Sequence, residues 1–320
     1  MRPSLPLALA TAFTLLVARS SAGEPPSWAF AVNPPDARSA HDDGLPMRIP
    51  GSDRVFSRAQ LGTIDGPICD WHPEEHPAMP PIVARGRAPR AYACGYCHLP
   101  DGAGRPENAS LAGLTAAYFK EQVHAFREGD RPGSEPRRGP QTTMVAIAKA
   151  LTEPEIDAAA AYFESVKPSS FVRVVETPTV PRTVVSGWTL ARAPDGGTEP
   201  IGGRIIEMAV DFRLFESRDT HTRYVAFAPP GSIGRGADLA ATGARGRSVA
   251  CATCHGPELR GVAAVPRLAG RSPSYLARQL YDLRTAKRRG GNAELMKPVV
   301  AHLSDEEIVE LCAFIASLSP

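Results

Sequence analysis

The sequence has very few long hydrophobic runs, and this limits where the protein can reside. Beyond the first residues, no segment approaches the roughly 20 apolar residues that a membrane-spanning helix needs. The exception is Leu5 to Ala18, which follows Arg2 and precedes the small residues Ser20-Ser21-Ala22. This order is typical of a secretory signal peptide, with an uncleaved anchor as the alternative. We predict that residues 1–22 are removed and that the mature chain is exported, soluble and periplasmic, with no transmembrane segment.

The predicted mature chain also has no net charge. Removing residues 1–22 takes away Arg2 and Arg19 and no acidic residue, which leaves 34 basic and 34 acidic residues. The sequence also has no basic tract of the kind that binds nucleic acid. We therefore predict no nucleic-acid partner.

Cysteine is scarce, and its placement is more informative than its number. Four of the six cysteines lie in the pentapeptides CGYCH, residues 94–98, and CATCH, residues 251–255. The other two are Cys69 and Cys312. Export permits disulfides, but a Cys-x-x-Cys-His motif that occurs twice indicates another use for these four thiols.

The two motifs belong to a longer internal repeat. When Cys251 is aligned with Cys94, an offset of 157 residues, Leu111-Ala112-Gly113 falls on Leu268-Ala269-Gly270. The same offset aligns four further identical pairs: Tyr118 with Tyr275, Gln122 with Gln279, Arg127 with Arg284, and Arg131 with Arg288. After a gap of five residues, Met144 aligns with Met296, Leu151 with Leu303, and Thr152 with Ser304. A match of this length indicates a duplicated domain.

Each copy ends in a predicted helix. Thr152-x-x-Glu155 and Ser304-x-x-Glu307 have the pattern of capping boxes, which satisfy free amides at a helix start. Four apolar residues follow at helical spacing in each copy: Ile156, Ala159, Ala160 and Phe163, then Ile308, Leu311, Cys312 and Ile315. Cys312 takes the place of Ala160, so we predict that it is a small buried core residue.

The rest of the chain differs from the repeat. Residues 23–80 are rich in proline and polar residues, which predicts irregular packing over a domain surface. Residues 169–232 contain the β-rich runs FVRVVETPTV, TVVSGWTLAR and RIIEMAVDF, broken by Pro and Gly, so we predict a connecting segment with short strands. The repeated units are then residues 81–168 and 233–320, and both are mainly helical.

The repeated motif has three chemical interpretations. Structural zinc needs four closely grouped ligands, whereas these cysteine pairs are 157 residues apart. A thioredoxin-like redox site needs a βαβ context, which neither flank offers. Covalent haem fits best, because Cys94 and Cys97, and again Cys251 and Cys254, can add to the two vinyl groups of one haem. The adjacent His98 and His255 then bind the iron.

A haem that transfers electrons usually has a sixth iron ligand, and a methionine thioether raises its potential. Met144 and Met296 lie at equivalent places, each seven residues before the leucine that precedes its capping box. We predict that they are the sixth ligands. Met47, Met79 and Met208 have no equivalents and are predicted to be packing residues.

These motifs together resemble the two halves of a bacterial dihaem class I cytochrome c. The resemblance covers about residues 90–167 and 235–320, and it implies two tandem cytochrome c domains with two covalently bound haem c groups. In such domains a proline before Leu-Ala-Gly typically offers its carbonyl to the ring of the iron-binding histidine. Pro266 matches this pattern, whereas the first copy has Ala109 there.

The stretch CDWHPEEHPAMP places Cys69, His72, His76 and Met79 within eleven residues, which is the ligand set of a copper site. Copper sites normally gather ligands from distant parts of a rigid scaffold, and this loop is proline-rich. The alternatives are a surface loop with a free or paired thiol, or a histidine at a haem edge.

The sequence therefore predicts an exported two-haem cytochrome that carries single electrons between redox partner proteins, on the dehydrogenase or the oxidase side. One alternative is an enzyme, either a dihaem peroxidase or an oxidoreductase of a small sulfur compound, which needs an iron with an open site. Another is a cytochrome subunit of a larger dehydrogenase or oxidase complex.

Overall fold

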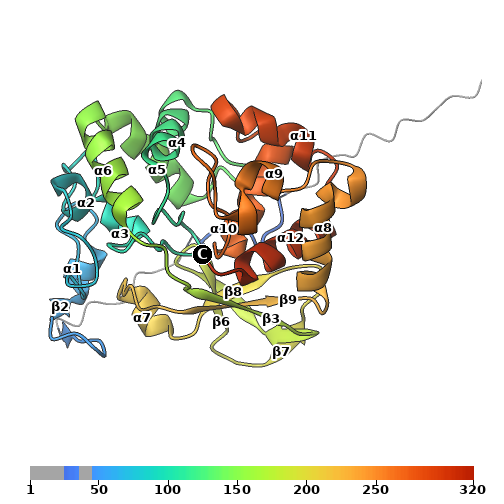
Figure 1. Ribbon diagram of the computed structural model, residues 1–320. Helices are drawn as coiled ribbons and strands as arrows, with labels where there is room; N and C mark the ends of the chain where they lie inside the picture. The colour runs from blue at the N-terminus through green and yellow to red at the C-terminus, as the bar shows by residue number, and fades with distance from the viewer. Residues whose placement is uncertain (1–24, 36–44) are drawn as a thin grey trace, which may run out of the picture.

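The computed structural model describes residues 25–35 and 45–320, so the predicted signal peptide, residues 1–22, lies outside the described residues. Two helical units stand side by side, and a set of short strands lies beneath them (Figure 1). This arrangement confirms the predicted fold class, which is mainly α with two tandem units joined by a partly β segment.

The first unit packs its helices around one apolar core. Helices α4 and α6 lie against each other, and Ile156 and Phe163 of α6 are fully buried between them. The helices of this unit are α2 Pro81–Ala84, α3 Cys94–His98, α4 Ala116–Glu128, α5 Gly139–Ala150 and α6 Glu153–Ser165. Because α6 presents the predicted apolar residues to this core, the sequence pattern of the closing helix is confirmed.

The second unit repeats this plan, with a longer helix before its Cys-x-x-Cys-His motif than the short α2 of the first unit. This helix, α8, packs along the closing helix, α12, and Cys312 is fully buried in the core of this unit, as predicted. The helices are α8 Ser232–Gly246, α9 Ala252–His255, α10 Pro273–Arg284, α11 Lys297–Val300 and α12 Asp305–Ser317, with short 3-10 turns η1 Pro257–Leu259 and η2 Gly291–Met296.

The repeated residues make repeated contacts. Both predicted capping boxes form, with Glu155 bonding back to Thr152 and Glu307 bonding back to Ser304. Arg127 donates to the carbonyl of Leu151 at 2.9 Å, and Arg284 donates to that of Leu303 at 2.7 Å. These paired contacts confirm that the two halves are copies of one domain.

The middle segment forms the strands predicted for it. Strand β3 pairs in parallel with β9, with Val172 opposite Tyr224, and β8 pairs antiparallel with β9. Two further antiparallel pairs, β4 with β7 and β5 with β6, form separate two-stranded sheets. The elements are β3 Val172–Glu176, β4 Thr179–Pro181, β5 Thr183–Ser186, β6 Thr189–Arg192, β7 Thr198–Pro200, β8 Ile206–Ala209, α7 Phe212–Glu216 and β9 Tyr224–Ala228.

This sheet packs mainly against the second unit. Helix α12 lies on β3 and β9, and Ile205, Ala226 and Ala228 belong to the core of the second unit. The sheet is therefore fixed to one half of the molecule, and its loops reach across to the other half.

The N-terminal extension covers surface, as predicted, and it also contains ordered elements. Strands β1 Pro46–Met47 and β2 Phe56–Ser57 pair, and helix α1 Arg58–Gly62 follows directly. Leu61 and Trp71 are buried in a small core of their own. Among the described residues, no helix is both long enough and apolar enough to cross a membrane.

Candidate functional site

The first Cys-x-x-Cys-His motif forms the short helix α3 and holds its histidine by a backbone contact. The Nδ1–H of His98 donates to the carbonyl of Ala109 at 2.8 Å, and Asn108 donates to the carbonyl of Cys97 at 3.1 Å. Gly104 lies at the bend with φ +71°, where a Cβ atom would come 2.5 Å from the Ala109 oxygen. The turn therefore requires glycine, and it aims the Nε2 atom of His98 away from the backbone.

The second motif has the same geometry. The Nδ1–H of His255 donates to the carbonyl of Pro266 at 2.9 Å, and Gly261, at the place of Gly104, has φ +86°. The contact in the first copy thus forms although Ala109 replaces the usual proline, because the acceptor is a backbone oxygen. Burial lowers the pKa of both His98 and His255. Each ring therefore stays neutral and keeps a lone pair on Nε2.

The two methionines lie on different local structures. Met144 is in the middle of α5 and is half-buried against the first core. Met296 ends η2, just before α11, and is half-buried against the second core, as are Cys251 and Leu268. The repeat has a gap of five residues before this position, which accounts for the different secondary structure around the two methionines.

A cavity of about 760 Å³ brings the residues of the first copy together. Cys94, Cys97, His98 and Met144 all line it. Its wall is otherwise largely apolar and aromatic, with Leu111, Leu114, Phe119, Val123, Phe126 and Ile147. This volume falls in the range of about 300–1,000 Å³ that is usual for cofactor sites.

Arginines from both halves meet between the two units. Arg131 of the first half donates to Gln279 of the second at 2.7 Å. Arg288 of the second half donates to Tyr118 and to Gln122 of the first, both at 2.9 Å. These residues are the pairs that the repeat had aligned, and each half supplies an arginine to the other.

This interface carries strong positive charge. Burial lowers the pKa of Arg138, and that of Arg267, to about 9. Burial alone would raise the pKa of Tyr275, but the charges of Arg131, Arg288 and Arg271 outweigh it and lower this pKa to about 8. Such an environment favours a bound anionic group.

Several of these arginines have unused donors. The Nη2 atoms of Arg138 and Arg271 are buried and have no hydrogen-bond partner among the described residues, and both arginines line the cavity. A haem is flat and mostly apolar, and it carries two propionate carboxylates. Carboxylates are the groups that guanidinium donors bind best. The apolar wall and these free donors therefore fit a haem.

Residues far away in the sequence close the first cavity, and none of them was predicted to lie there. Trp188, between β5 and β6, packs on Gly139 so closely that a Cβ atom there would come 2.6 Å from its ring. Its amide donates to Asn33 of the N-terminal extension at 2.9 Å. Phe215 and Met47 line the same cavity. The middle segment and the extension thus cover the first motif.

The four residues of the possible copper set face different surroundings. Cys69 packs beside Trp71, and burial raises the pKa of its thiol to about 11. His76 contacts Asp70 and the hydroxyl of Tyr162, while Met79 packs on the first core. His72 instead contacts Asp219. The structure does not bring these four together, nor does it place Cys69, His72 or His76 on the wall of the cavity at the first motif.

The fold and the site define a dihaem electron-transfer cytochrome with two covalently bound haem c groups. The family model for cytochrome c matches residues 83–167 and again 235–319, which together make up more than half of the chain. The chain belongs to the cytochrome c family.

Three relatives show what this chain is similar to. A thiosulfate dehydrogenase electron acceptor of Stutzerimonas stutzeri (strain A1501) is 29% identical over 73% of this chain and 82% of its own length. A cytochrome c4 of Azotobacter vinelandii is 26% identical over 72% of this chain and 86% of its own length. A thiosulfate dehydrogenase electron acceptor of Thiomonas intermedia (strain K12) is 25% identical over 86% of this chain and 94% of its own length.

Among solved structures, a thiosulfate dehydrogenase (TsdBA) from Marichromatium purpuratum matches 74% of this chain with a TM-score of 0.50 and 27% identity. The match covers 38% of that longer chain.

Proposed function

We propose that Cys94 and Cys97 hold the first haem by thioether bonds and that His98 binds its iron. Cys251, Cys254 and His255 do the same for the second haem, and the two haem-binding units span residues 81–168 and 233–320. The observation that carries this proposal is the shared cavity of Cys94, Cys97 and His98, together with the matching histidine geometry of the second motif. When bound, each haem supplies one-electron chemistry by alternating between ferric and ferrous iron.

Met144 and Met296 are the sixth ligands in this proposal. Met144 supports it by lining the cavity that holds His98, and Met296 by its half-buried place in the same core as Cys251. With these methionines as ligands, the irons would have no free position for a small substrate. The chain's own residues then serve to hold, orient and shield the two groups, which suits a carrier better than an enzyme.

The electron donor that fits the comparisons best is a thiosulfate dehydrogenase. Two relatives that align over most of their own length bear the name thiosulfate dehydrogenase electron acceptor. Among the described residues, the N-terminal extension packs on both units, with Phe30 in the second core and Met79 on the first. We place the protein downstream of such an enzyme.

We also propose that the protein is exported to the periplasm after cleavage of residues 1–22. The mass of the mature chain tests this cleavage.

Mixing purified components tests the partner. The haem-loaded protein, a catalytic thiosulfate dehydrogenase and thiosulfate are combined, and reduction is followed by the haem absorption bands. We expect both haems to be reduced in the full mixture, and neither to be reduced by thiosulfate without the enzyme.

Two outcomes contradict this proposal. Rapid reduction by thiosulfate alone, or turnover of hydrogen peroxide with a high-spin haem signal, indicates that the chain is itself the enzyme. If the protein stays oxidised in the full mixture, its electron donor is a different protein. That result leaves the haem assignments untouched, because the haem spectra test them separately.

A further inference from the structure

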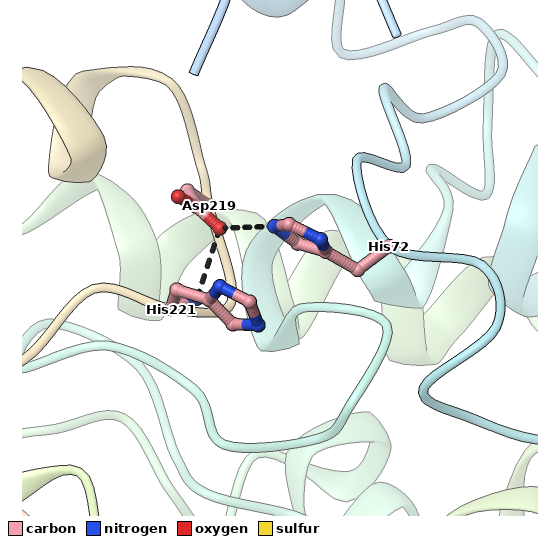
Figure 2. A group of neighbouring side chains, drawn as sticks. All are labelled: His72, Asp219 and His221. Atoms are coloured by element: carbon pink, nitrogen blue, oxygen red, sulfur yellow. Dashed lines mark hydrogen bonds and ion pairs between the residues drawn. The ribbon is translucent and has the colours of Figure 1, made fainter. Parts of the chain in front are cut away.

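A second group of possible metal ligands lies outside the haem-binding residues, where the N-terminal extension meets the middle segment. His72 comes from the loop before α2, and Asp219 and His221 come from the loop between α7 and β9. Figure 2 shows the three side chains together, with the Asp219 carboxylate facing the His72 ring. The extension and the middle segment have no equivalent in the other half of the repeat, so the duplicated fold does not account for this cluster.

The distances within the cluster suit a small cation. Asp219 Oδ1 lies 3.1 Å from His72 Nε2 and 2.9 Å from the backbone nitrogen of His221. The ligand atoms of all three side chains lie within 4.8 Å of one another. Two ligands of a tetrahedral zinc ion, each about 2.0–2.2 Å from the metal, are about 3.3 Å apart. The cluster is therefore close to the size of a metal site.

Two buried polar atoms in this cluster have no hydrogen-bond partner among the described residues. They are Oδ2 of Asp219 and Nδ1 of His72, and both side chains are only 1% exposed. Leaving a buried carboxylate oxygen unpaired costs free energy. A bound cation would remove that cost at Asp219 and would be within reach of Nε2 of His72, whose Nδ1 faces Glu74 Oε1, 3.9 Å away.

Glu75 lies beside this group and contacts His221. Its Oε2 atom is 2.8 Å from His221 Nε2. The side chain of His221 is 38% exposed and stacks on the His72 ring at 3.8 Å, so it can turn toward a metal without disturbing the core.

We propose that His72, Asp219 and His221 bind one divalent transition metal ion, best suited to zinc, and that Glu75 completes the ligand set. Two imidazoles with carboxylates are zinc ligands, whereas calcium and magnesium prefer a shell made of oxygen atoms alone. This inference is independent of the haem ligands and of the electron donor.

The position of the site gives the metal a structural role. On one side, Trp71 donates to the carbonyl of Ser217 at 2.8 Å. Beside it, Arg218 donates to the carbonyl of Tyr96 at 2.9 Å, and Arg218 and Tyr96 both line the first cavity. A metal between His72 and residues 219–221 joins the two segments that cover the first motif.

Zinc titration of the haem-loaded protein tests this proposal. The protein is treated with a chelator and dialysed, then titrated with zinc sulfate by calorimetry, and bound zinc is counted by mass spectrometry. We expect about one zinc per chain, and affinity reduced by at least about tenfold in His221→Gln and in Asp219→Asn. Unchanged haem absorption bands verify that each variant is folded.

Two control variants locate the metal. His124→Gln changes a similarly exposed histidine, 3.1 Å from Glu153, and should leave zinc binding intact. Cys69→Ser removes the nearby thiol and should also leave it intact. The proposal is overturned if the native protein binds no zinc, if His221→Gln binds as well as the native protein, or if Cys69→Ser loses the metal.

Discussion

At the residue scale, the two methionines differ more than their equivalent positions suggest. Met144 is held by a full helical turn on each side within α5, whereas Met296 joins η2 to α11. Met47 also lines the first cavity, so two thioethers are available there. Substitution is needed to tell them apart.

Replacing Met144 by Ala should remove the far-red sulfur-to-iron absorption of one haem and lower its potential, because the thioether no longer favours ferrous iron. Met296→Ala should do the same to the other haem. Spectra of each variant, with a redox titration, measure both effects.

Met47→Leu is the matched control, since it keeps the volume of a side chain on the same cavity wall. It should leave the spectrum unchanged. If Met47→Leu loses the band while Met144→Ala keeps it, the ligand of the first haem is Met47.

The shared geometry of the two Cys-x-x-Cys-His motifs was predictable, because the repeated spacing is a local signal. The contact to Ala109 was harder to predict, since a pattern based on proline does not reveal that the acceptor is a backbone oxygen. The places of Arg138 and Trp188 on the cavity wall could not be predicted. Arg138 contacts Trp188, about 50 residues later, and Trp188 contacts Asn33, which is more distant still.

At the element scale, the arginine that follows α4 contacts α10, and the arginine that follows α10 contacts α4. Arg288 reaches Tyr118 and Gln122 on α4, and both of those side chains line the first cavity. With the proposed haem in this cavity, the charge of Arg288 would act on the haem of the other half.

Replacing Arg288 by Gln should lower the potential of the first haem by on the order of tens of millivolts, because a nearby positive charge favours the more negative, ferrous state. A redox titration that resolves the two haems measures the shift.

Arg289→Gln is the control for this charge. Arg289 is next in the sequence and also reaches the first half, but it is exposed and pairs with Asp130 at 3.1 Å. Water and Asp130 screen it, so the potentials should stay unchanged. Equal shifts in the two variants contradict a specific role for Arg288.

The closing helices of both halves were predictable, because capping boxes and apolar spacing are local signals. Short strands in the middle segment were predictable from composition. The parallel pairing of β3 with β9 was not, since Val172 and Tyr224 are distant in sequence and no local pattern states their register.

At the scale of the whole molecule, the two motifs are unequally covered. The middle segment and the extension close over the first, and the ring of Tyr96 lies under Arg218 at 3.6 Å. Around the second motif, Cys254 is exposed, and so are Val249 and Val262. We therefore expect a redox partner to dock at the face around the second motif.

Replacing Val262 by Lys should slow electron exchange with a redox partner, because the added charge disturbs an apolar contact beside the second motif. Val184→Lys is the control: Val184 is exposed to a similar degree, 43% against 52%, but lies on the middle segment. Stopped-flow reduction by the partner measures both rates, and equal rates in the two variants contradict the assignment of this face.

The contacts that Arg131 and Arg288 make between the two halves also constrain the order in which the protein matures. The pocket at residues 94–98 includes side chains of Tyr275 and Gln279. A ribosome makes these about 180 residues later, so the first half emerges with an unfinished pocket. Attachment of its haem can begin early, but the final environment of that haem is set only when the last third of the chain has been synthesised and has folded against it.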